Sequence, residues 1–208
     1  SLFFFSLMDI THREEVEERI LQQLNFDALT GLPSRYNLIS QVEKHILSSQ
    51  TAGVLTPFVF VFFDLDRFKT INDALGHRIG DAFLAALCQR VRDFLDEKHV
   101  FGRFGGDEFI LFLPTVTDLD EALQISLQAL SQMRQPFDVS GYRLSCGASF
   151  GLARFPDHGT SVDTLIDAAD TAMYHIKSQG IGGCAPYDSS MNVERCSQLE
   201  LEQELREA

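Results

Sequence analysis

The sequence predicts a mixed α/β (α+β) fold, in which a central, mostly antiparallel sheet is flanked by helices as in a ferredoxin-like sandwich. Strand-like apolar runs alternate with amphipathic helical segments along most of the 208 residues. Two of these runs are joined by a Gly-Gly turn at 105–106, which indicates an antiparallel hairpin. The run 58–63 is apolar at six consecutive positions, as expected of a central strand buried on both faces.

The first half of the chain is expected to begin with a turn-rich segment at 27–33. A helix then runs from 34 to 49, and the buried strand at 58–63 follows it. Residues 67–76 form a helix or a compact loop. A second helix runs from 81 to 95, because its apolar residues recur at helical spacing and can face the core.

The second half is expected to contain, in order, a hairpin at 100–113, a helix near 118–133, a hairpin turn at 139–142, a long strand at 144–155, a helix at 161–177 and a short edge strand at 185–187. From the buried strand onward this order is roughly β-α-α-β-β-α-β, with one extra hairpin. Such an order indicates an antiparallel-rich α/β sandwich of the ferredoxin-like type.

The two ends of the chain are expected to belong to other parts of a longer protein. The apolar residues 1–8 are interpreted as the last strand of a preceding domain. Residues 11–25 predict a polar helix with one thin apolar stripe, which is either a coiled-coil connector or an amphipathic helix packed on its own domain. We therefore divide the chain into a connector at 1–26, a main domain at 27–188 and a linker helix at 189–208.

Composition narrows the classes of partner. The chain carries 30 Asp and Glu against 17 Lys and Arg, a formal net charge of −13. Non-specific nucleic-acid binding needs a basic surface, so we expect no nucleic-acid partner. A small polyanion can still bind if a metal ion supplies positive charge locally. Four scattered cysteines without a Cys-x-x-Cys pair favour a reducing, cytoplasmic location, and the run 1–8 is far shorter than the ~20 residues of a membrane span.

Two acidic clusters are the candidate functional residues. Asp64 and Asp66 follow the buried strand and share one face by the period of two. A carboxylate at the end of such a strand is costly unless it is hydrogen-bonded or bound to a cation, and Mg²⁺ commonly uses one or two carboxylates plus substrate phosphates. Asp66 is either a second ligand or the cap of the next helix. Asp107 and Glu108 should point to opposite faces, so one of them faces a given site unless the turn twists.

Four motifs in the right order carry a resemblance to a known family. Residues 103–109 read Arg-Phe-Gly-Gly-Asp-Glu-Phe, and they are accompanied by matching segments at 27–35, 64–81 and 169–177. Together they resemble the GGDEF domain of the diguanylate cyclase family, which condenses two GTP molecules into cyclic di-GMP and two pyrophosphates. The resemblance covers residues 27–188. It implies the nucleotidyl cyclase palm as the fold and a homodimer for catalysis, because each domain holds one GTP.

The resemblance also implies roles for individual positions. Asp64, the main-chain carbonyl of Leu65, Asp107 and Glu108 would hold Mg²⁺, with Mn²⁺ as an alternative. Asp107 and Glu108 would be the catalytic residues, with Glu108 supporting a second metal ion or the attacking hydroxyl. The residues that would contact GTP are Phe68 and Lys69 at the phosphates, Asn72 and Asp81 at the guanine, Gly105 and Gly106 along the backbone, and Lys177 at the phosphates. Without the resemblance, Asn72 would be interpreted as a turn residue and Asp81 as a helix N-cap.

Two positions depart from the family pattern. The family's product-inhibition motif is Arg-x-x-Asp, and the corresponding residues here are Asp96-Glu97-Lys98-His99. An acid in place of the Arg predicts poor binding of an anionic dinucleotide there. Further along, Ile181 replaces an Arg that helps to bind the γ-phosphate in the family. Arg makes bidentate phosphate contacts that Ile cannot make, so we expect weaker GTP binding.

The flanking segments resemble parts of other domains. Residues 8–13 resemble the exit from a PAS sensor domain, and residues 191–206 resemble the linker into an EAL phosphodiesterase domain. This leaves three functions open. The chain is an active diguanylate cyclase, a catalytically weak GTP-binding module that regulates a neighbouring EAL domain, or a purely structural dimerisation domain. The filled metal and base positions favour the first.

Overall fold

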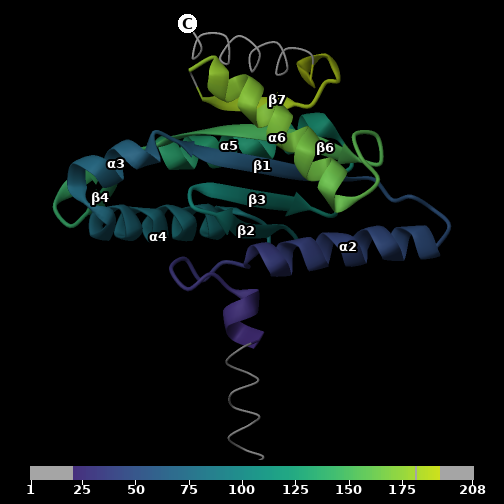
Figure 1. The fold of residues 1–208 in the computed structure, drawn as a ribbon, viewed down its shortest axis with the longest axis horizontal. Coiled ribbons are helices and arrows are strands. Elements are labelled where there is room, and N and C mark those ends of the chain that lie inside the picture. Colours follow the sequence, from purple (N-terminus) through teal and green to yellow (C-terminus); the bar gives the residue numbers. More distant parts are fainter. Residues whose placement is uncertain (1–20, 181, 193–208) are drawn as a thin grey trace, which may run out of the picture.

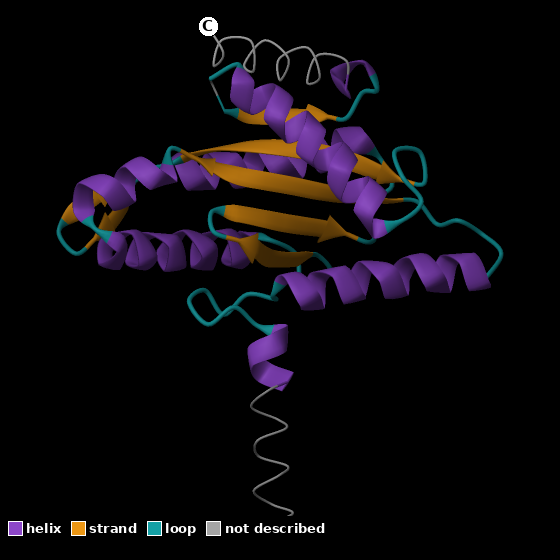
Figure 2. Ribbon diagram, viewed as in Figure 1, coloured by secondary structure: helices purple, strands orange, loops and turns teal. Residues whose placement is uncertain are grey.

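The computed structural model describes residues 21–180 and 182–192. It confirms the predicted mixed α/β fold, since a central sheet of five strands lies between helices (Figures 1 and 2). Residues 21–25 are helical, in agreement with that part of the expected connector helix. The other expectations for the connector, for position 181 and for the linker after residue 192 lie outside the described residues. Among the helices that are described, none has the length and apolar character needed to cross a membrane.

The sheet is built around one central strand. Its strands, in spatial order, are β2 (Val100–Gly105), β3 (Glu108–Leu113), β1 (Phe58–Asp66), β6 (Gly147–Phe155) and β7 (Gly183–Pro186). The neighbours pair antiparallel except for β6 and β7, which run parallel. The predicted hairpin, central strand and short edge strand are therefore confirmed, with β7 starting two residues earlier than expected.

The helices cover the two faces of the sheet. α2 (Arg35–Thr51) and α6 (Val162–Ser178) pack on one face, and α4 (His77–Phe94) and α5 (Leu119–Arg134) pack on the other (Figure 1). The short helix α3 (Phe68–Leu75) leads from the end of β1 to α4. The hydroxyl groups of Ser34 and Ser161 each accept a hydrogen bond from the backbone N–H of the third residue of the helix that follows, so both helices begin where the sequence predicts.

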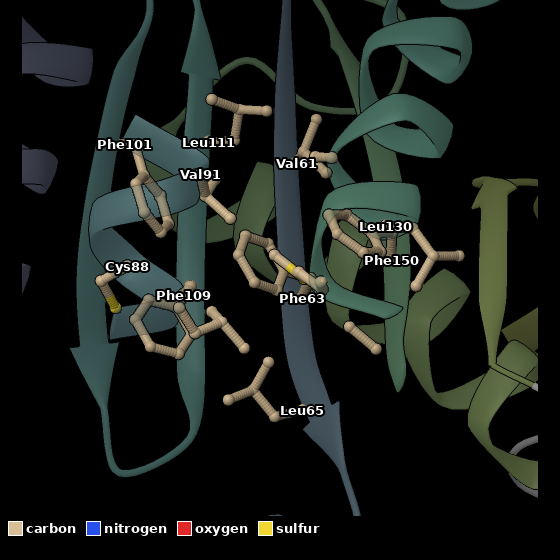
Figure 3. Packing of buried hydrophobic residues seen from close by; sticks show 14 of the residues in the cluster. Val61, Phe63, Leu65, Cys88, Val91, Phe101, Phe109, Leu111, Leu130 and Phe150 are labelled. Atoms are coloured by element: carbon tan, nitrogen blue, oxygen red, sulfur yellow. The ribbon is translucent and has the colours of Figure 1, made fainter. Parts of the chain in front are cut away.

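The apolar run of β1 joins two hydrophobic clusters. All eight residues from Phe58 to Leu65 are buried, and alternate side chains enter the clusters on opposite faces. Phe63 stacks between Phe109 and Phe150, with ring centroids 5.2 and 4.4 Å apart respectively (Figure 3). Burying one such side chain contributes roughly 1.5–3 kcal/mol, so the strand that carries the candidate site is also the best anchored.

The expected start of α4 is wrong. The helix begins at His77, four residues before Asp81, directly after Gly76 ends α3 at φ +82°. Gly80, which directly precedes the expected start, does not mark a boundary but serves a close packing contact inside the helix. A Cβ atom at Gly80 would lie 1.8 Å from Oδ1 of Asn72, so a larger residue would force the Asn72 side chain to move.

The long strand expected at 144–155 is confirmed as β6 (Gly147–Phe155), which starts three residues later than expected. β4 (Phe137–Val139) and β5 (Tyr142–Leu144) form a separate hairpin, and β6 begins only at Gly147. The turn of this hairpin is where the sequence predicts it, with Gly141 at φ +86°. The start of β6 packs closely against the end of β1, since a Cβ atom at Gly147 would lie 2.7 Å from Oδ2 of Asp66.

Candidate functional site

Two carboxylates face each other where the sheet ends. Asp64 on β1 lies directly opposite Glu108 on β3, and the two residues share the face that α6 covers. The Asp64 side chain is only 8% exposed, because apolar residues surround β1 up to this point. The sheet thus brings together one acid from each of the two clusters that the sequence singled out.

The signature turn is tied to the end of β1. The Leu65 N–H donates to the backbone carbonyl of Asp107 over 3.1 Å. Because the N–H and C=O of one residue in a strand point to the same edge, the Leu65 carbonyl also points toward the turn. Gly106 adopts φ +54°, a conformation that L side chains rarely adopt. The turn therefore places Asp107 beside Asp64 and Glu108, and these three acids interact electrostatically.

Arg103 braces this turn from the outside. Its Nε and Nη2 donate to the Gly106 carbonyl at 3.0 and 2.7 Å, and its Nη1 donates to both carboxylate oxygens of Asp27 at 3.0 and 3.2 Å. Asp27 also accepts from the backbone N–H and the hydroxyl of Thr30. Burial tends to raise the pKa of Asp27, but these hydrogen bonds and the Arg103 charge bring it below its usual value. Sequence reasoning identified both residues only as members of motifs and missed this contact.

Lys177 on α6 reaches Asp64. Its Nζ donates to Oδ1 of Asp64 at 2.7 Å, although 44% of the Lys177 side chain is exposed. The reach depends on Gly151 in β6, where a Cβ atom would lie 1.9 Å from the backbone oxygen of Ala169 in α6. Glycine at this position lets the helix backbone rest on the sheet. The resemblance implied a phosphate contact for Lys177, whereas this structure pairs it with the predicted metal ligand.

The acids repel one another and are partly desolvated. Burial is the largest cause that raises the pKa of Asp64, and Asp107 and Asp66 add to it; the bond from Lys177 opposes this rise without cancelling it. Burial also raises the pKa of Glu108, with Asp64 and Asp107 contributing. Burial alone would lower the pKa of Lys177, but its bond to Asp64 and the surrounding acids raise it. The site therefore favours an additional positive charge.

The donor set suits a hard cation that is completed by a ligand. Within residues 21–180 and 182–192, no group of three or more His, Cys, Asp or Glu side chains is arranged to hold a metal ion by itself. Mg²⁺ does not require such a cage, since it commonly takes one or two carboxylates together with substrate phosphates and water. Asp64 and Glu108, with the carbonyl of Leu65 and the nearby Asp107, provide oxygen donors of that kind. We conclude that these residues fit Mg²⁺.

The Asp66 side chain makes packing and hydrogen-bond contacts within the protein. Its Oδ1 accepts a hydrogen bond of 2.8 Å from the Ser149 hydroxyl. Its Oδ2 lies against two glycine backbones, and a Cβ atom at Gly182 would come within 2.3 Å of it. The alternative that Asp66 caps the next helix is wrong, because α3 starts after Arg67. Asp66 instead holds the segment after α6 against the start of β6.

The residues expected to contact the nucleotide lie on α3 and the start of α4. Phe68 is buried and Lys69 is exposed in the first turn of α3. Asn72 lies inside α3 and Asp81 lies exposed inside α4, so the turn and N-cap interpretations are both wrong. Oδ1 of Asn72 is buried and has no hydrogen-bond partner among the described residues. The contact at Gly80 brings the two helices together and places Asn72 beside the residue that precedes Asp81.

Gly105 and Gly106 border a cavity of about 620 Å³. Its other walls come from the segment that precedes α2, including Asp27, from Arg35 at the start of α2, and from Arg103 and Phe104. The guanidinium of Arg35 lies 4.2 Å above the ring of Phe104. The lining contains neither Asp64 nor Glu108, so the cavity lies outside the acidic site.

Comparison with known proteins identifies the family. The model of the family described as "Diguanylate cyclase, GGDEF domain" matches residues 24–182. The chain belongs to this family. The matched range contains the acidic site, the signature turn and both helices expected to contact the nucleotide. It begins close to the boundary expected at 27 and ends shortly before the one expected at 188.

Relatives of this GGDEF domain are larger proteins. It is 34% identical over 198 residues to a bifunctional diguanylate cyclase/cyclic di-GMP phosphodiesterase, MucR, of Pseudomonas aeruginosa, covering 95% of this chain and 28% of MucR. It is 33% identical over 164 residues to the diguanylate cyclase TpbB of the same species, covering 78% of this chain and 37% of TpbB. The chain thus corresponds to 28% of the length of MucR and 37% of the length of TpbB.

The fold is shared with solved GGDEF domains. A structure comprising only the GGDEF domain of TpbB from Pseudomonas aeruginosa matches with a TM-score of 0.75 and 32% identity. The match covers 83% of this chain and 99% of that one. The shared fold includes the sheet that brings Asp64 and Glu108 together here.

Proposed function

We propose that this chain is the catalytic domain of a diguanylate cyclase, which joins two GTP molecules into cyclic di-GMP and releases two pyrophosphates. The observation that carries the proposal is the pair Asp64 and Glu108, two partly desolvated acids held opposite each other beside the signature turn. Membership of the GGDEF family and similarity to a protein named diguanylate cyclase support the same activity.

The acidic site would hold Mg²⁺ or Mn²⁺ through Asp64, the carbonyl of Leu65, Asp107 and Glu108. The ion, when bound, supplies positive charge to the phosphate oxygens. Glu108 would support a second metal ion or accept the proton of the attacking ribose 3′-hydroxyl. The backbone at Gly105 and Gly106 carries no side chain, so GTP can lie against the turn.

Residues on α3 and α4 would select guanine and orient the triphosphate. The Asp81 carboxylate can accept from the guanine N–H groups, and the Asn72 amide can both donate and accept. Both residues are placed by the close contact of the two helices at Gly80. Lys69, exposed in the first turn of α3, and Lys177 on α6 would add positive charge near the phosphates, together with the backbone amides at Phe68 and Lys69.

The reaction requires two copies of the domain. Each domain would bind one GTP, and the two nucleotides have to face each other for the paired attack, so we propose a homodimer as the active form. An upstream PAS-like domain and a downstream EAL domain would control how the two copies meet. The relatives are multidomain proteins of which this chain covers only a part, which supports such neighbours.

A second function is favoured by one residue. Ile181 stands where the family has an Arg that contacts the γ-phosphate, and losing a charge-assisted contact weakens binding by roughly 10- to 100-fold. The domain would then be a catalytically weak, GTP-binding regulator of a neighbouring phosphodiesterase. Its similarity to the cyclic di-GMP phosphodiesterase PdeR of Escherichia coli, at 33% identity, is consistent with this alternative.

One experiment separates the two functions. A dimeric preparation of the full-length protein is incubated with GTP and Mg²⁺, and the product is identified by chromatography. Cyclic di-GMP formation that is lost in Asp64→Asn and kept in Asp138→Asn, an exposed acid on β4, supports the cyclase. GTP binding without product supports the regulator. Absence of both binding and product overturns both proposals.

A further inference from the structure

A second cavity, of about 410 Å³, has Asp66, two residues after Asp64, in its lining. It lies where the end of β1, the C-terminus of α5, the start of β6 and the segment after α6 meet. The volume falls within the ~300–1,000 Å³ typical of small-ligand pockets. The residues that line it are Asp66, Arg67, Thr70, Ile71, Arg134, Ser145, Cys146, Gly147 and Gly180.

The lining is suited to an anion. Two guanidinium groups, those of Arg67 and Arg134, line one small cavity in a chain whose net charge is −13. Thr70 and Ser145 add hydroxyl groups that can donate hydrogen bonds. The lining also includes an acid, Asp66, but this side chain already accepts from Ser149 and lies against glycine backbones. Arg is the side chain that binds phosphate oxygens bidentately.

Arg134 contacts the segment that follows α6. It is the last residue of α5, and its Nη2 donates to the backbone carbonyl of Gly182 at 3.3 Å. Gly182 follows Ile181 directly in the chain. Arg67, the N-cap of α3 at φ +58°, lies one residue before the amides proposed to bind phosphate. The two guanidinium groups therefore come from the residue before α3 and from the end of α5, and they meet at one cavity.

We propose that this cavity is a phosphate subsite, in which Arg134 and Arg67 bind the terminal phosphates of the nucleotide and Arg134 takes over the role that Ile181 cannot fill. The proposal rests on the proposed GTP-binding function. It assigns affinity for the leaving pyrophosphate to two arginines on different elements, α3 and α5.

The test compares ligands with and without terminal phosphates. Binding of GTP, GMP and pyrophosphate to the dimeric full-length protein is measured by calorimetry in Mg²⁺ buffer. We expect Arg134→Gln and Arg67→Asn each to weaken GTP and pyrophosphate by about 10- to 100-fold and to leave GMP unchanged. Asn tolerates the positive φ at position 67, and this variant leaves the Gly182 contact of Arg134 intact. Arg92→Gln, which removes an exposed guanidinium from the last turn of α4, should change nothing.

A rescue experiment separates a phosphate contact from loop packing. We expect Ile181→Arg to add little affinity for pyrophosphate to the natural protein and to restore most of the affinity lost in Arg134→Gln, as expected for coupled sites. Unchanged pyrophosphate binding in both single variants would overturn the subsite. If the natural protein binds pyrophosphate in an Arg134-dependent way but neither GTP nor GMP, the proposed function fails and the subsite stands.

Discussion

Asp64 and Glu108 are held opposite each other on β1 and β3; burial raises the pKa of both carboxyl groups, Asp64 adds to the rise at Glu108, and Asp107 adds to the rise at both. Like charges placed directly across a strand pair destabilise a sheet. Such an arrangement persists when it serves a function, because a bound cation offsets the repulsion. The negative charge on these two residues therefore lowers the stability of the fold, whereas the proposed chemistry requires it.

Neutralising Glu108 should stabilise the protein and abolish synthesis. Since Glu108 is only partly buried, water screens the repulsion, and we expect Glu108→Gln to add about 0.5 kcal/mol to the free energy of unfolding at pH 7 without Mg²⁺. The gain should vanish as the pH falls below the ordinary Glu pKa, because a raised folded-state pKa penalises only the ionised form. Urea unfolding measures the gain. Glu43→Gln, at an exposed position on α2, should show no gain, and a destabilised Glu108→Gln would contradict the argument.

Lys177 should compete with a metal ion for Asp64. Its ammonium group occupies Oδ1 of Asp64 at 2.7 Å in this structure. We therefore expect Lys177→Met to tighten the binding of Mn²⁺ to the nucleotide-free protein while weakening the binding of GTP. Mn²⁺ titration followed by electron paramagnetic resonance measures the first effect. Lys44→Met, on the exposed side of α2, is the control, and weaker Mn²⁺ binding in Lys177→Met would refute the competition.

Asp27 should contribute stability that acid removes. Its pKa is lowered in the folded state, so its contribution is present above the ordinary Asp pKa near 4 and is lost as the pH falls through the folded value. We expect Asp27→Asn to cost about 1–2 kcal/mol at pH 7 and to flatten the loss of stability toward pH 3. Asp157→Asn, from the more exposed pair with Arg154, should cost little. If the free energy of unfolding falls equally steeply with pH in the natural protein and in Asp27→Asn, Asp27 is not the source of this loss.

Gly151 should be intolerant of any side chain. A Cβ atom would lie 1.9 Å from the oxygen of Ala169 and 2.4 Å from the nitrogen of Met173, and both are backbone atoms that move only with α6. We expect Gly151→Ala to cost about 2–3 kcal/mol and to lengthen the Lys177 to Asp64 contact. Gly105→Ala, where a Cβ atom meets open space, should leave the melting temperature within experimental error. Equal melting temperatures for both variants would show that α6 accommodates the methyl group.

Product should bind poorly at the site that precedes the signature turn. Asp96 replaces the family's Arg, and the adjoining cavity of about 310 Å³ is also lined by Glu97 and His99. Repulsion between the carboxylates of Asp96 and Glu97 and an anionic dinucleotide predicts no tight binding of cyclic di-GMP on this face. Calorimetric titration measures it, with Asp96→Arg as the comparison. Tight binding to the natural protein that Asp96→Arg leaves unchanged would place the product elsewhere, and loss of tight binding in Asp96→Arg would contradict the prediction.

Features encoded by local patterns are predicted well. The buried strand at 58–63, the Gly-Gly hairpin and the capped helix after Ser161 each follow from neighbouring residues, because periodicity and turn chemistry are local properties. The errors in the predicted boundaries lie where contacts with residues distant in the sequence determine where a helix or strand begins. The start of α4 is misplaced because Gly80, which resembles a boundary in the sequence, packs against Asn72 on another helix. The strand expected at 144–155 begins only at Gly147, and residue 144 pairs instead with Phe137 in the separate hairpin.

The candidate site divides in the same way. The residue types of Asp64 and Glu108 indicate metal chemistry from the sequence alone, but their opposition across β1 and β3 is a matter of register. The Asp27 to Arg103 contact spans 76 positions, and no periodicity in either segment signals it. At the level of the sequence, it is the family resemblance that brings these segments together.

The contact between Lys177 and Asp64 joins residues 113 positions apart, and it bridges the last long helix and the central strand. Contacts of such long range form late, because the entropy of closing the intervening chain has to be overcome first. During synthesis, Asp64 leaves the ribosome long before its partner. A chain synthesised only as far as β6 consequently lacks Lys177 and the helix that covers the two acids. The complete site, with both Asp64 and Lys177 in place, is thus present only after the whole domain has folded.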